Sequence, residues 1–205
     1  MVLPNFIVFE GIDGAGTSTQ WELLKKRAGR DWFFTAEPTA GPAGVFLRRL
    51  LGGAESVEAG TMVFLFAADR YEHLYGAGGI LEALQAGKTV VSDRYLFSSL
   101  AYQSVGLGDS LPRLVNSSFP LPKHLFYFRI NVDAALARIA GRPAAEIYEK
   151  RDFLEKTAAA YDRVIASYEA APPEEAGQSM HIHHLNAQLP AAHIAEQIRT
   201  ILSVP

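Results

Sequence analysis

The sequence predicts a single α/β domain with a five-stranded parallel sheet and helices on both faces. Short runs rich in aromatic and β-branched residues alternate five times with helical segments along the 205 residues. This alternation is typical of parallel sheets, because each pair of parallel strands needs a long crossover connection. A chain of this length can bury a substantial core. We therefore expect one domain over residues 1–205, with a mobile lid at about 141–151.

The pattern along the chain sets the expected elements. Apolar runs bounded by polar or turn residues predict strands at 6–9, 31–36, 88–93, 124–131 and 180–186. Helical runs begin near residue 18 and are also expected at 44–51, 57–86, 98–103, 132–140, 152–171 and 190–202. Three glycines near residue 78 interrupt the run 57–86, and Asp152 is the expected N-cap of the long helix. Residues 106–122 are expected to be mostly loop with one helical turn, 141–150 a flap and 172–179 a turn.

The stretch between the first strand and the first helix is rich in glycine. Gly11, Gly14 and Gly16 lie between a buried strand and a helix start, an arrangement in which backbone N–H groups can surround an anion. Gly11 and Gly16 have the spacing of the pattern G-x-x-x-x-G-K-[ST], and Ser18 stands at its metal-binding hydroxyl. Thr17 stands where this pattern has lysine, so a strand–turn–helix corner without a ligand is the alternative.

Composition excludes several classes of function. The formal net charge is −3 and the isoelectric point about 6.1, so the chain lacks the basic character of nucleic-acid-binding proteins. The absence of cysteine excludes disulfides, thiol catalysis and cysteine-ligated zinc. The first residues lack the features of a signal peptide, and no apolar run reaches the roughly 18 residues of a membrane span. We expect a cytoplasmic protein that binds neither nucleic acid nor membrane.

Polar side chains follow the other strands. Glu37 follows the second strand, and Asp93 and Arg94 follow the third, so both segments should meet the glycine-rich loop at one sheet edge. A carboxylate there can hold Mg²⁺, and an arginine beside it can bind phosphate, although a plain ion pair is the alternative. Two helical pairs at i and i+4, Phe66 with Arg70 and Ser99 with Gln103, can stack on and hydrogen-bond a nucleobase. Phe66 alone would more often be a core residue.

Together these motifs resemble those of the thymidylate kinase family, which phosphorylates dTMP to dTDP with ATP. The likeness covers about residues 6–161, with a looser match through Glu146-Ile-Tyr148-Glu149. Five segments follow the family's order and spacing: 9–20, Glu37-Pro38, Phe66-x-x-x-Arg70, Asp93-Arg94-Tyr95 and Ser98-Ser99-x-Ala-Tyr102-Gln103. Each is weak alone, but five in order are specific. The resemblance implies a three-layer fold of the phosphate-loop NTPase type, a nucleoside monophosphate kinase acting in dTTP biosynthesis, and a homodimer.

The resemblance also implies roles for the matched residues. The ATP phosphates would lie on the loop formed by Gly11, Ile12, Asp13, Gly14, Ala15, Gly16, Thr17, Ser18 and Thr19. The implied dTMP-binding residues are Asp13, Glu37, Arg48, Phe66, Arg70, Arg94, Ser99, Tyr102 and Gln103. Phe66 would stack on thymine, Arg70 would donate to a thymine carbonyl, and Tyr102 would leave little room for a 2′-hydroxyl. Ser18 and Asp93 would bind Mg²⁺, with Asp93 and Arg94 serving catalysis.

The sequence departs from the family pattern at three positions, each of which loses a positive charge. These are Thr17 in the loop, Ala36 before Glu37, and Ile147 in the lid. Removing one cation that stabilises a transferring phosphoryl group commonly costs about 10²–10³-fold in rate. Candidate replacements are Arg94, Arg138, Arg142, Lys150 and Arg151, and we take Arg142, at the start of the flap, as the catalytic one.

Three interpretations remain open from the sequence. We favour a working dTMP kinase, because Ser18, Asp93 and Arg94 persist together with the whole base pocket. The others are a nucleotide-binding pseudo-kinase or sensor with little turnover, and a kinase of another deoxynucleotide or of a deoxynucleoside. His181, His183 and His184 lie on a predicted strand. A metal site there is not expected, because the sequence has no nearby carboxylate to support it.

Overall fold

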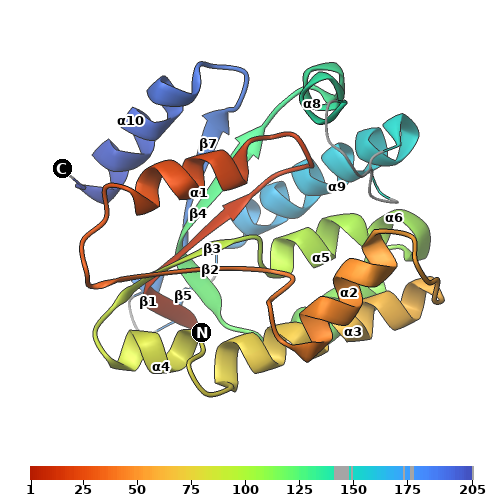
Figure 1. Cartoon of the computed structure of the whole chain (residues 1–205), viewed down its shortest axis with the longest axis horizontal. Coiled ribbons are helices and arrows are strands. Elements are labelled where there is room, and N and C mark those ends of the chain that lie inside the picture. The colour runs from red at the N-terminus through yellow and green to blue at the C-terminus, as the bar shows by residue number, and fades with distance from the viewer. Residues whose placement is uncertain (141–147, 149, 173, 176–177, 205) are drawn as a thin grey trace.

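The computed structural model describes residues 1–140, 148, 150–172, 174–175 and 178–204. Its main sheet has five parallel strands in the order β2-β3-β1-β4-β7, as the sequence predicts (Figure 1). The strands are β1 (Val2–Glu10), β2 (Trp32–Ala36), β3 (Thr89–Asp93), β4 (Leu121–Arg129) and β7 (His181–Asn186). Because β1 lies at the centre, the chain first builds the sheet on one side of β1 and then on the other.

Helices cover both faces of this sheet. They are α1 (Thr17–Lys25), α2 (Pro42–Leu51), α3 (Ala59–Tyr75), α4 (Ile80–Gln85), α5 (Leu96–Tyr102), α6 (Ser104–Leu107), α7 (Ser110–Asn116), α8 (Val132–Ile139), α9 (Arg151–Ala170) and α10 (Ala191–Leu202). Figure 1 shows α1 and α10 on one side of the sheet and α3, α4 and α5 on the other. Trp21 of α1 packs on Phe34 of β2, and on the opposite face Tyr161 of α9 stacks on Tyr127 of β4. The expected three-layer α/β fold is confirmed.

The carboxyl ends of the three strands on one side of the sheet are joined by backbone hydrogen bonds. The N–H of Arg94, after β3, donates to the carbonyl of Phe9 in β1 at 2.9 Å. The N–H of Glu37, after β2, donates to the carbonyl of Asp93 at 3.0 Å. The glycine-rich loop, the Glu37 turn and the Asp93–Arg94 segment therefore meet at one edge, as the parallel topology requires.

Several local predictions differ from the structure. Residues 106–122, expected to be mostly loop, contain half of α6 and all of α7, because burial of Pro112 and Asn116 of α7 favours a helix that has little local signal. Strand β4 begins at Leu121 and includes Pro122, which sits beside an irregularity in the pairing with β1 where a missing N–H is tolerated. Asp152 lies inside the first turn of α9, and Lys150 occupies the N-cap position.

The C-terminal part holds two further features. A two-stranded antiparallel ribbon, β5 (Glu174–Glu175) with β6 (Gln178–Ser179), replaces the turn expected at 172–179. His124 and His183 lie 3.0 Å apart between ring nitrogens, while His184 bonds Glu169 at 2.6 Å. Within the described ranges, no three His, Cys, Asp or Glu side chains are placed to hold a metal ion. None of the helices in those ranges is both long and apolar enough to cross a membrane.

Candidate active site

A cavity of about 350 Å³ opens at the carboxyl ends of β1, β2 and β3. The structure brings together most residues that the sequence analysis selected. Those lining the cavity are Ile12, Asp13, Gly14, Gly16, Thr17, Ser18, Thr19, Glu37, Arg48, Phe66, Asp93, Arg94, Ser99, Tyr102 and Gln103. Arg142 and most of the expected lid lie outside the described residues.

The glycine-rich loop leaves a row of backbone donors unpaired. Gly14 and Gly16 have positive φ angles of 83° and 92°, which glycine adopts without steric cost. A side chain at Gly14 would place its Cβ 2.5 Å from the carbonyl of Ala135 in α8, so the loop packs closely on that helix. The N–H groups of Thr17, Ser18 and Thr19 open α1 and find no acceptor in the part of the chain that the structure describes. Unpaired amides at a helix N-terminus can bind an anion.

Not every amide of the loop is available to an anion. The N–H of Asp13 donates to the Tyr102 hydroxyl at 3.0 Å, and the N–H of Ala15 donates to the Ile12 carbonyl at 3.0 Å. The amides that could bind an anion therefore cover only part of the loop from Gly11 to Thr19.

Ser18 and Asp93, the two residues expected to bind a metal ion, are in direct contact. The Ser18 hydroxyl donates to Oδ2 of Asp93 at 2.5 Å. The other carboxylate oxygen, Oδ1, is buried and has no hydrogen-bond partner among the described residues. A buried carboxylate oxygen without a partner costs stability, so it marks a place that a ligand can fill. Carboxylate and hydroxyl oxygens are the ligands that Mg²⁺ prefers, and this pair fits that ion.

Arg94 is held by its neighbours with part of its guanidinium left over. Nη2 donates to Oδ1 of Asp13 at 2.6 Å, and Nη1 donates to the Gly11 carbonyl at 3.0 Å and to the Ser98 hydroxyl at 3.1 Å. The Nε–H group and one N–H on Nη2 have no acceptor within the described ranges. Burial disfavours the charge of Arg94, yet the neighbouring Tyr102 and Asp13 raise its pKa above that of a free arginine. Arg94 is thus a fixed cation with donors free for an anion.

The end of the cavity lined from α3 and α5, which lie across the sheet from α1 (Figure 1), combines an aromatic ring with buried polar groups. Phe66 lines it from α3, and Ser99 and Gln103 line it from the α5 side. Oε1 of Gln103 is buried without a partner in the described part of the chain. Tyr102 donates its hydroxyl hydrogen to Oδ2 of Asp13 at 2.8 Å, and burial, followed by the Asp13 charge, raises the pKa of Tyr102 well above its usual value. Its hydroxyl therefore stays protonated.

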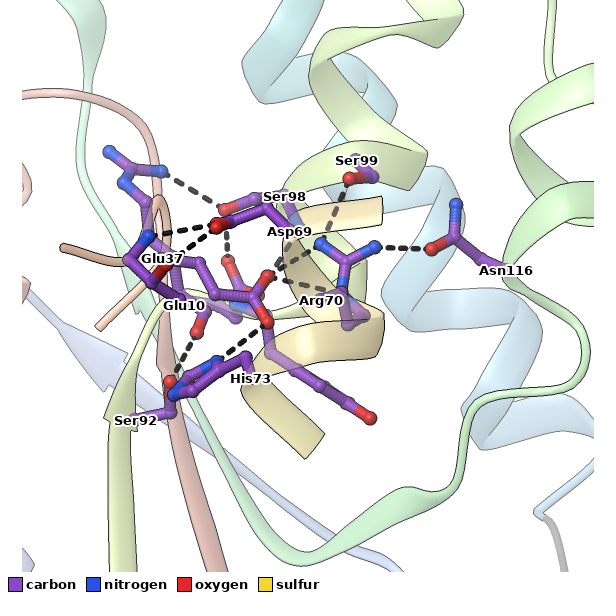
Figure 2. A network of polar contacts seen from close by, with 12 residues as sticks. Glu10, Glu37, Asp69, Arg70, His73, Ser92, Ser98, Ser99 and Asn116 are labelled. Carbon is purple, nitrogen blue, oxygen red and sulfur yellow. Dashed lines mark hydrogen bonds and ion pairs between the residues drawn. The ribbon is translucent and has the colours of Figure 1, made fainter. Parts of the chain in front are cut away.

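Arg70 does not line the cavity, contrary to the expectation that it contacts a base directly. Figure 2 shows its guanidinium between Glu37, Ser99 and Asn116. Nε and Nη2 donate to Oε2 of Glu37 at 3.0 and 2.6 Å, Nη2 also donates to Ser99 Oγ at 3.0 Å, and Nη1 donates to Asn116. Arg70 is only 1% exposed, and a guanidinium buried in this way needs such partners. It acts on the cavity through Ser99 and Glu37.

Comparison with known proteins decides the family. The family model described as thymidylate kinase matches residues 9–200. The chain belongs to the thymidylate kinase family. A Treponema pallidum (strain Nichols) protein named "Putative thymidylate kinase" is 44% identical over 166 residues, 80% of each chain.

Two further relatives agree with this family. One from Methanocaldococcus jannaschii, named "Probable thymidylate kinase", is 40% identical over 169 residues, covering 82% of this chain and 85% of the relative. The "Thymidylate kinase" of Leptospira borgpetersenii serovar Hardjo-bovis (strain L550) is 38% identical over 172 residues, covering 79% and 82%.

Two of the candidate replacement cations of this thymidylate kinase family member, Arg138 and Arg151, lie outside the main cavity. Arg138 of α8 lies behind the loop, where its guanidinium donates to the carbonyls of Gly14 and Ala187 at 3.2 and 2.8 Å. It borders a second cavity of about 250 Å³ that shares Gly16 with the main one. Arg151 instead forms an exposed ion pair with Asp133 at 2.7 Å. Among the described cations, only Arg48 and Arg94 line the main cavity.

Two residues of the site escaped the sequence analysis. Tyr148 lines the main cavity, and its ring stacks on Phe153 with centroids 4.7 Å apart. The sequence gives no signal that would orient this ring, beyond its place in the loosely matching lid. Glu10, at the end of β1, is fully buried beneath the cavity, where burial raises its pKa to about 7 against the lowering effect of its hydrogen bond with Ser98. The signal in the sequence that could have identified Glu10 is an acidic residue directly after the apolar run 6–9.

Proposed function

We infer that this protein transfers the γ-phosphoryl group of ATP to dTMP, giving dTDP and ADP. The observation that carries this inference is one cavity with two different ends. The phosphate loop, Ser18 and Asp93 lie at one end, and Phe66 with Ser99 and Gln103 at the other. The names of the relatives agree with this activity. A pseudo-kinase or sensor is not favoured, since both ends retain their polar groups.

The ATP phosphates would lie on the unpaired amides of residues 17–19, aligned with the positive end of the α1 dipole. The second cavity, which shares Gly16 and is bordered by Arg138, would take the adenine end of ATP. A guanidinium can stack on a base, and the carbonyls that anchor Arg138 hold its plane in place.

Ser18 and Asp93 would hold Mg²⁺. The support is the unpartnered Oδ1 of Asp93 beside a serine hydroxyl that opens α1. When bound, the ion would neutralise charge on the phosphate oxygens.

The base end favours thymine over cytosine. The Ser99 hydroxyl oxygen accepts from Arg70, so its own hydrogen is free to donate to a carbonyl such as O4 of thymine. Oε1 of Gln103 can accept from the ring N3–H of thymine. Cytosine presents an amino group and an unprotonated N3 instead, which would leave these buried groups mismatched. Phe66 would supply stacking.

The dTMP phosphate would bind the free N–H groups of Arg94, with Arg48 beside them. Glu37 would lie near this phosphate, with its carboxylate held in place by Arg70 and by His73 Nδ1 at 3.1 Å. The Asp13–Tyr102 pair would border the deoxyribose and crowd a 2′-hydroxyl. The remaining cation for transfer would come from Arg142 in the lid.

We also propose that the protein is a homodimer through α3. Phe64, Tyr71 and Tyr75 are 57%, 58% and 45% exposed, and their spacing places them along one side of that helix. A row of exposed aromatic rings favours a protein interface. Sedimentation velocity should show a dimer for the natural protein and a monomer for Tyr71→Glu. Ile201→Glu on α10, at a 38% exposed position, should remain dimeric, and a monomeric natural protein would exclude this interface.

A coupled assay of ADP formation across all nucleoside monophosphates tests the function. We expect dTMP to give the highest kcat/KM with Mg²⁺ and ATP, and chelation of the metal to abolish turnover. A higher kcat/KM for another monophosphate would reassign the substrate, and no ADP formation with any of them would exclude a kinase.

A further inference from the structure

Glu10 has no part in the proposed chemistry, yet its carboxyl group is the most heavily bonded in the site. It is 0% exposed and does not line the main cavity. Oε1 accepts from the N–H groups of Tyr95 and Ser98 at 2.8 and 3.2 Å. Oε2 accepts from the hydroxyls of Ser98 and Tyr161 at 2.6 and 2.8 Å. Burying a carboxyl group is costly unless it is hydrogen-bonded, and these four bonds offset that cost.

The backbone at Arg94 is in a conformation that needs support. Its φ angle is 70°, in the left-handed region that costs a residue with a Cβ about 1–2 kcal/mol. The peptide that follows Arg94 is held from both sides. On one side, the Ser92 hydroxyl donates to the Arg94 carbonyl at 2.7 Å. On the other, the N–H of Tyr95 donates to Oε1 of Glu10.

The side chain of Arg94 meets the same carboxyl group through one intermediate. Nη1 donates to the Ser98 hydroxyl oxygen at 3.1 Å, and that hydroxyl donates to Glu10 at 2.6 Å. Figure 2 shows the Ser98 side chain next to Glu10. With Ser98 fixed in this way, the bonds of Arg94 to Gly11 and Asp13 leave the Nε–H edge of the guanidinium free.

We propose that Glu10 is a positioning residue that fixes both the backbone and the guanidinium of Arg94, through the Tyr95 amide and the Ser98 hydroxyl. The inference rests on the proposed function, in which Arg94 binds the phosphate of dTMP. Glu10 therefore contributes to phosphate binding without touching the substrate.

The test compares dTMP with thymidine, which has the same base and sugar but no phosphate. Calorimetry on Ser98→Ala should show dTMP affinity reduced about 2- to 10-fold, the worth of one hydrogen bond, with thymidine affinity unchanged. Glu10→Gln should reduce dTMP affinity further. The glutamine carbonyl can still accept from both backbone N–H groups. At pH 8 and above, where Glu10 is ionised despite its pKa of about 7, the carboxylate accepts from Ser98, whereas the glutamine NH₂ would donate to it. Ser104→Ala, whose hydroxyl bonds only the Ala101 carbonyl, is the matched control and should change neither affinity.

A double-mutant cycle separates positioning from a merely structural effect. In an Arg94→Ala background, Ser98→Ala and Glu10→Gln should cause no further loss of dTMP affinity. Additive losses, or equal losses for thymidine and dTMP, would overturn the proposal. Should Glu10→Gln fail to fold, as thermal unfolding would reveal, the Ser98→Ala cycle decides alone. A natural protein that neither binds nor phosphorylates dTMP refutes the proposed function. An active natural protein with unaltered variants refutes only this inference.

Discussion

The two ends of the main cavity are built on opposite plans. At the base end, the charged groups are buried and paired within the protein, with Arg70 bonded to Glu37, Ser99 and Asn116, and the open acceptor is the uncharged Oε1 of Gln103. At the phosphate end, donors and acceptors are left open. The amides that begin α1 and Oδ1 of Asp93 have no partner among the described residues.

This difference indicates which property a substitution at each end would alter, base selection or turnover. A network that satisfies itself is rigid and selects a base by mismatch, because a wrong ligand leaves buried groups unpaired. An open set of donors depends on its ligand and on nearby cations for its energy. We therefore expect Thr17, which stands at the lysine position of the phosphate-loop pattern, to affect turnover at the phosphate end and to leave base selection at the other end unchanged.

The largest effect is expected at the open end. Asp93→Asn should lower kcat at least about 10³-fold, because it removes charge from a metal site that stabilises the transferring group by several kcal/mol. Steady-state assays at saturating dTMP would measure it. Asp133→Asn, at an exposed surface position, should leave kcat unchanged. Near-normal turnover of Asp93→Asn, or of the natural protein in excess chelator, would remove Asp93 from metal binding.

Two buried glutamates near the cavity differ in their partners. Glu37 forms an ion pair with Arg70. Glu10 accepts hydrogen bonds only from uncharged groups in the described chain, and burial raises its pKa to about 7. A raised pKa means that the folded protein holds this proton more tightly than the unfolded chain. The resulting stability is present below about pH 4.5 and is lost as the pH rises through about 7.

Glu10→Gln should remove this dependence. The stability of the natural protein relative to the variant should fall by up to about 3 kcal/mol between pH 4.5 and 8. Denaturant unfolding of both proteins across this range would measure the difference, and other titrating groups cancel because both chains carry them. A constant difference would show that Glu10 titrates normally.

The missing lysine provides the third test. Arg142→Ala should lower kcat about 10²-fold with little change in the KM for dTMP, the signature of a contact made mainly in the transition state. Thr17→Lys should raise kcat if the phosphate end lacks a cation, and lower it if a replacement already fills that space. A loss below about threefold for Arg142→Ala, together with a large gain for Thr17→Lys, would show that no residue replaces the lysine.

The last test concerns the base end. Phe66→Ala should raise the KM for dTMP about 5- to 150-fold, since stacking of a base on an aromatic ring is worth about 1–3 kcal/mol. The KM for ATP serves as the internal control and should not change. Equal increases for both substrates would point to a folding defect and not to a lost base contact.

The sequence alone determined the sheet, the phosphate loop and the edge at which the site lies. Glycine spacing, alternating apolar runs and polar residues directly after strands are local signals. Parallel topology then brings the ends of β1, β2 and β3 together. These inferences need no side-chain placement, so Ser18, Asp93 and Arg94 could be assigned to one site from their positions in the chain.

Only the tertiary structure decided which groups the protein satisfies and which it leaves open. Arg70 shares a helix face with Phe66, but its guanidinium turns to Glu37, which is distant in sequence, and away from the cavity. Glu10 gains its raised pKa from burial beneath α5 and α9, which a strand pattern cannot reveal. Helix α7 forms because its buried face has neighbours to pack against. Each case depends on contacts between segments far apart in the chain, and desolvation, the dominant energy there, is fixed only when those segments meet.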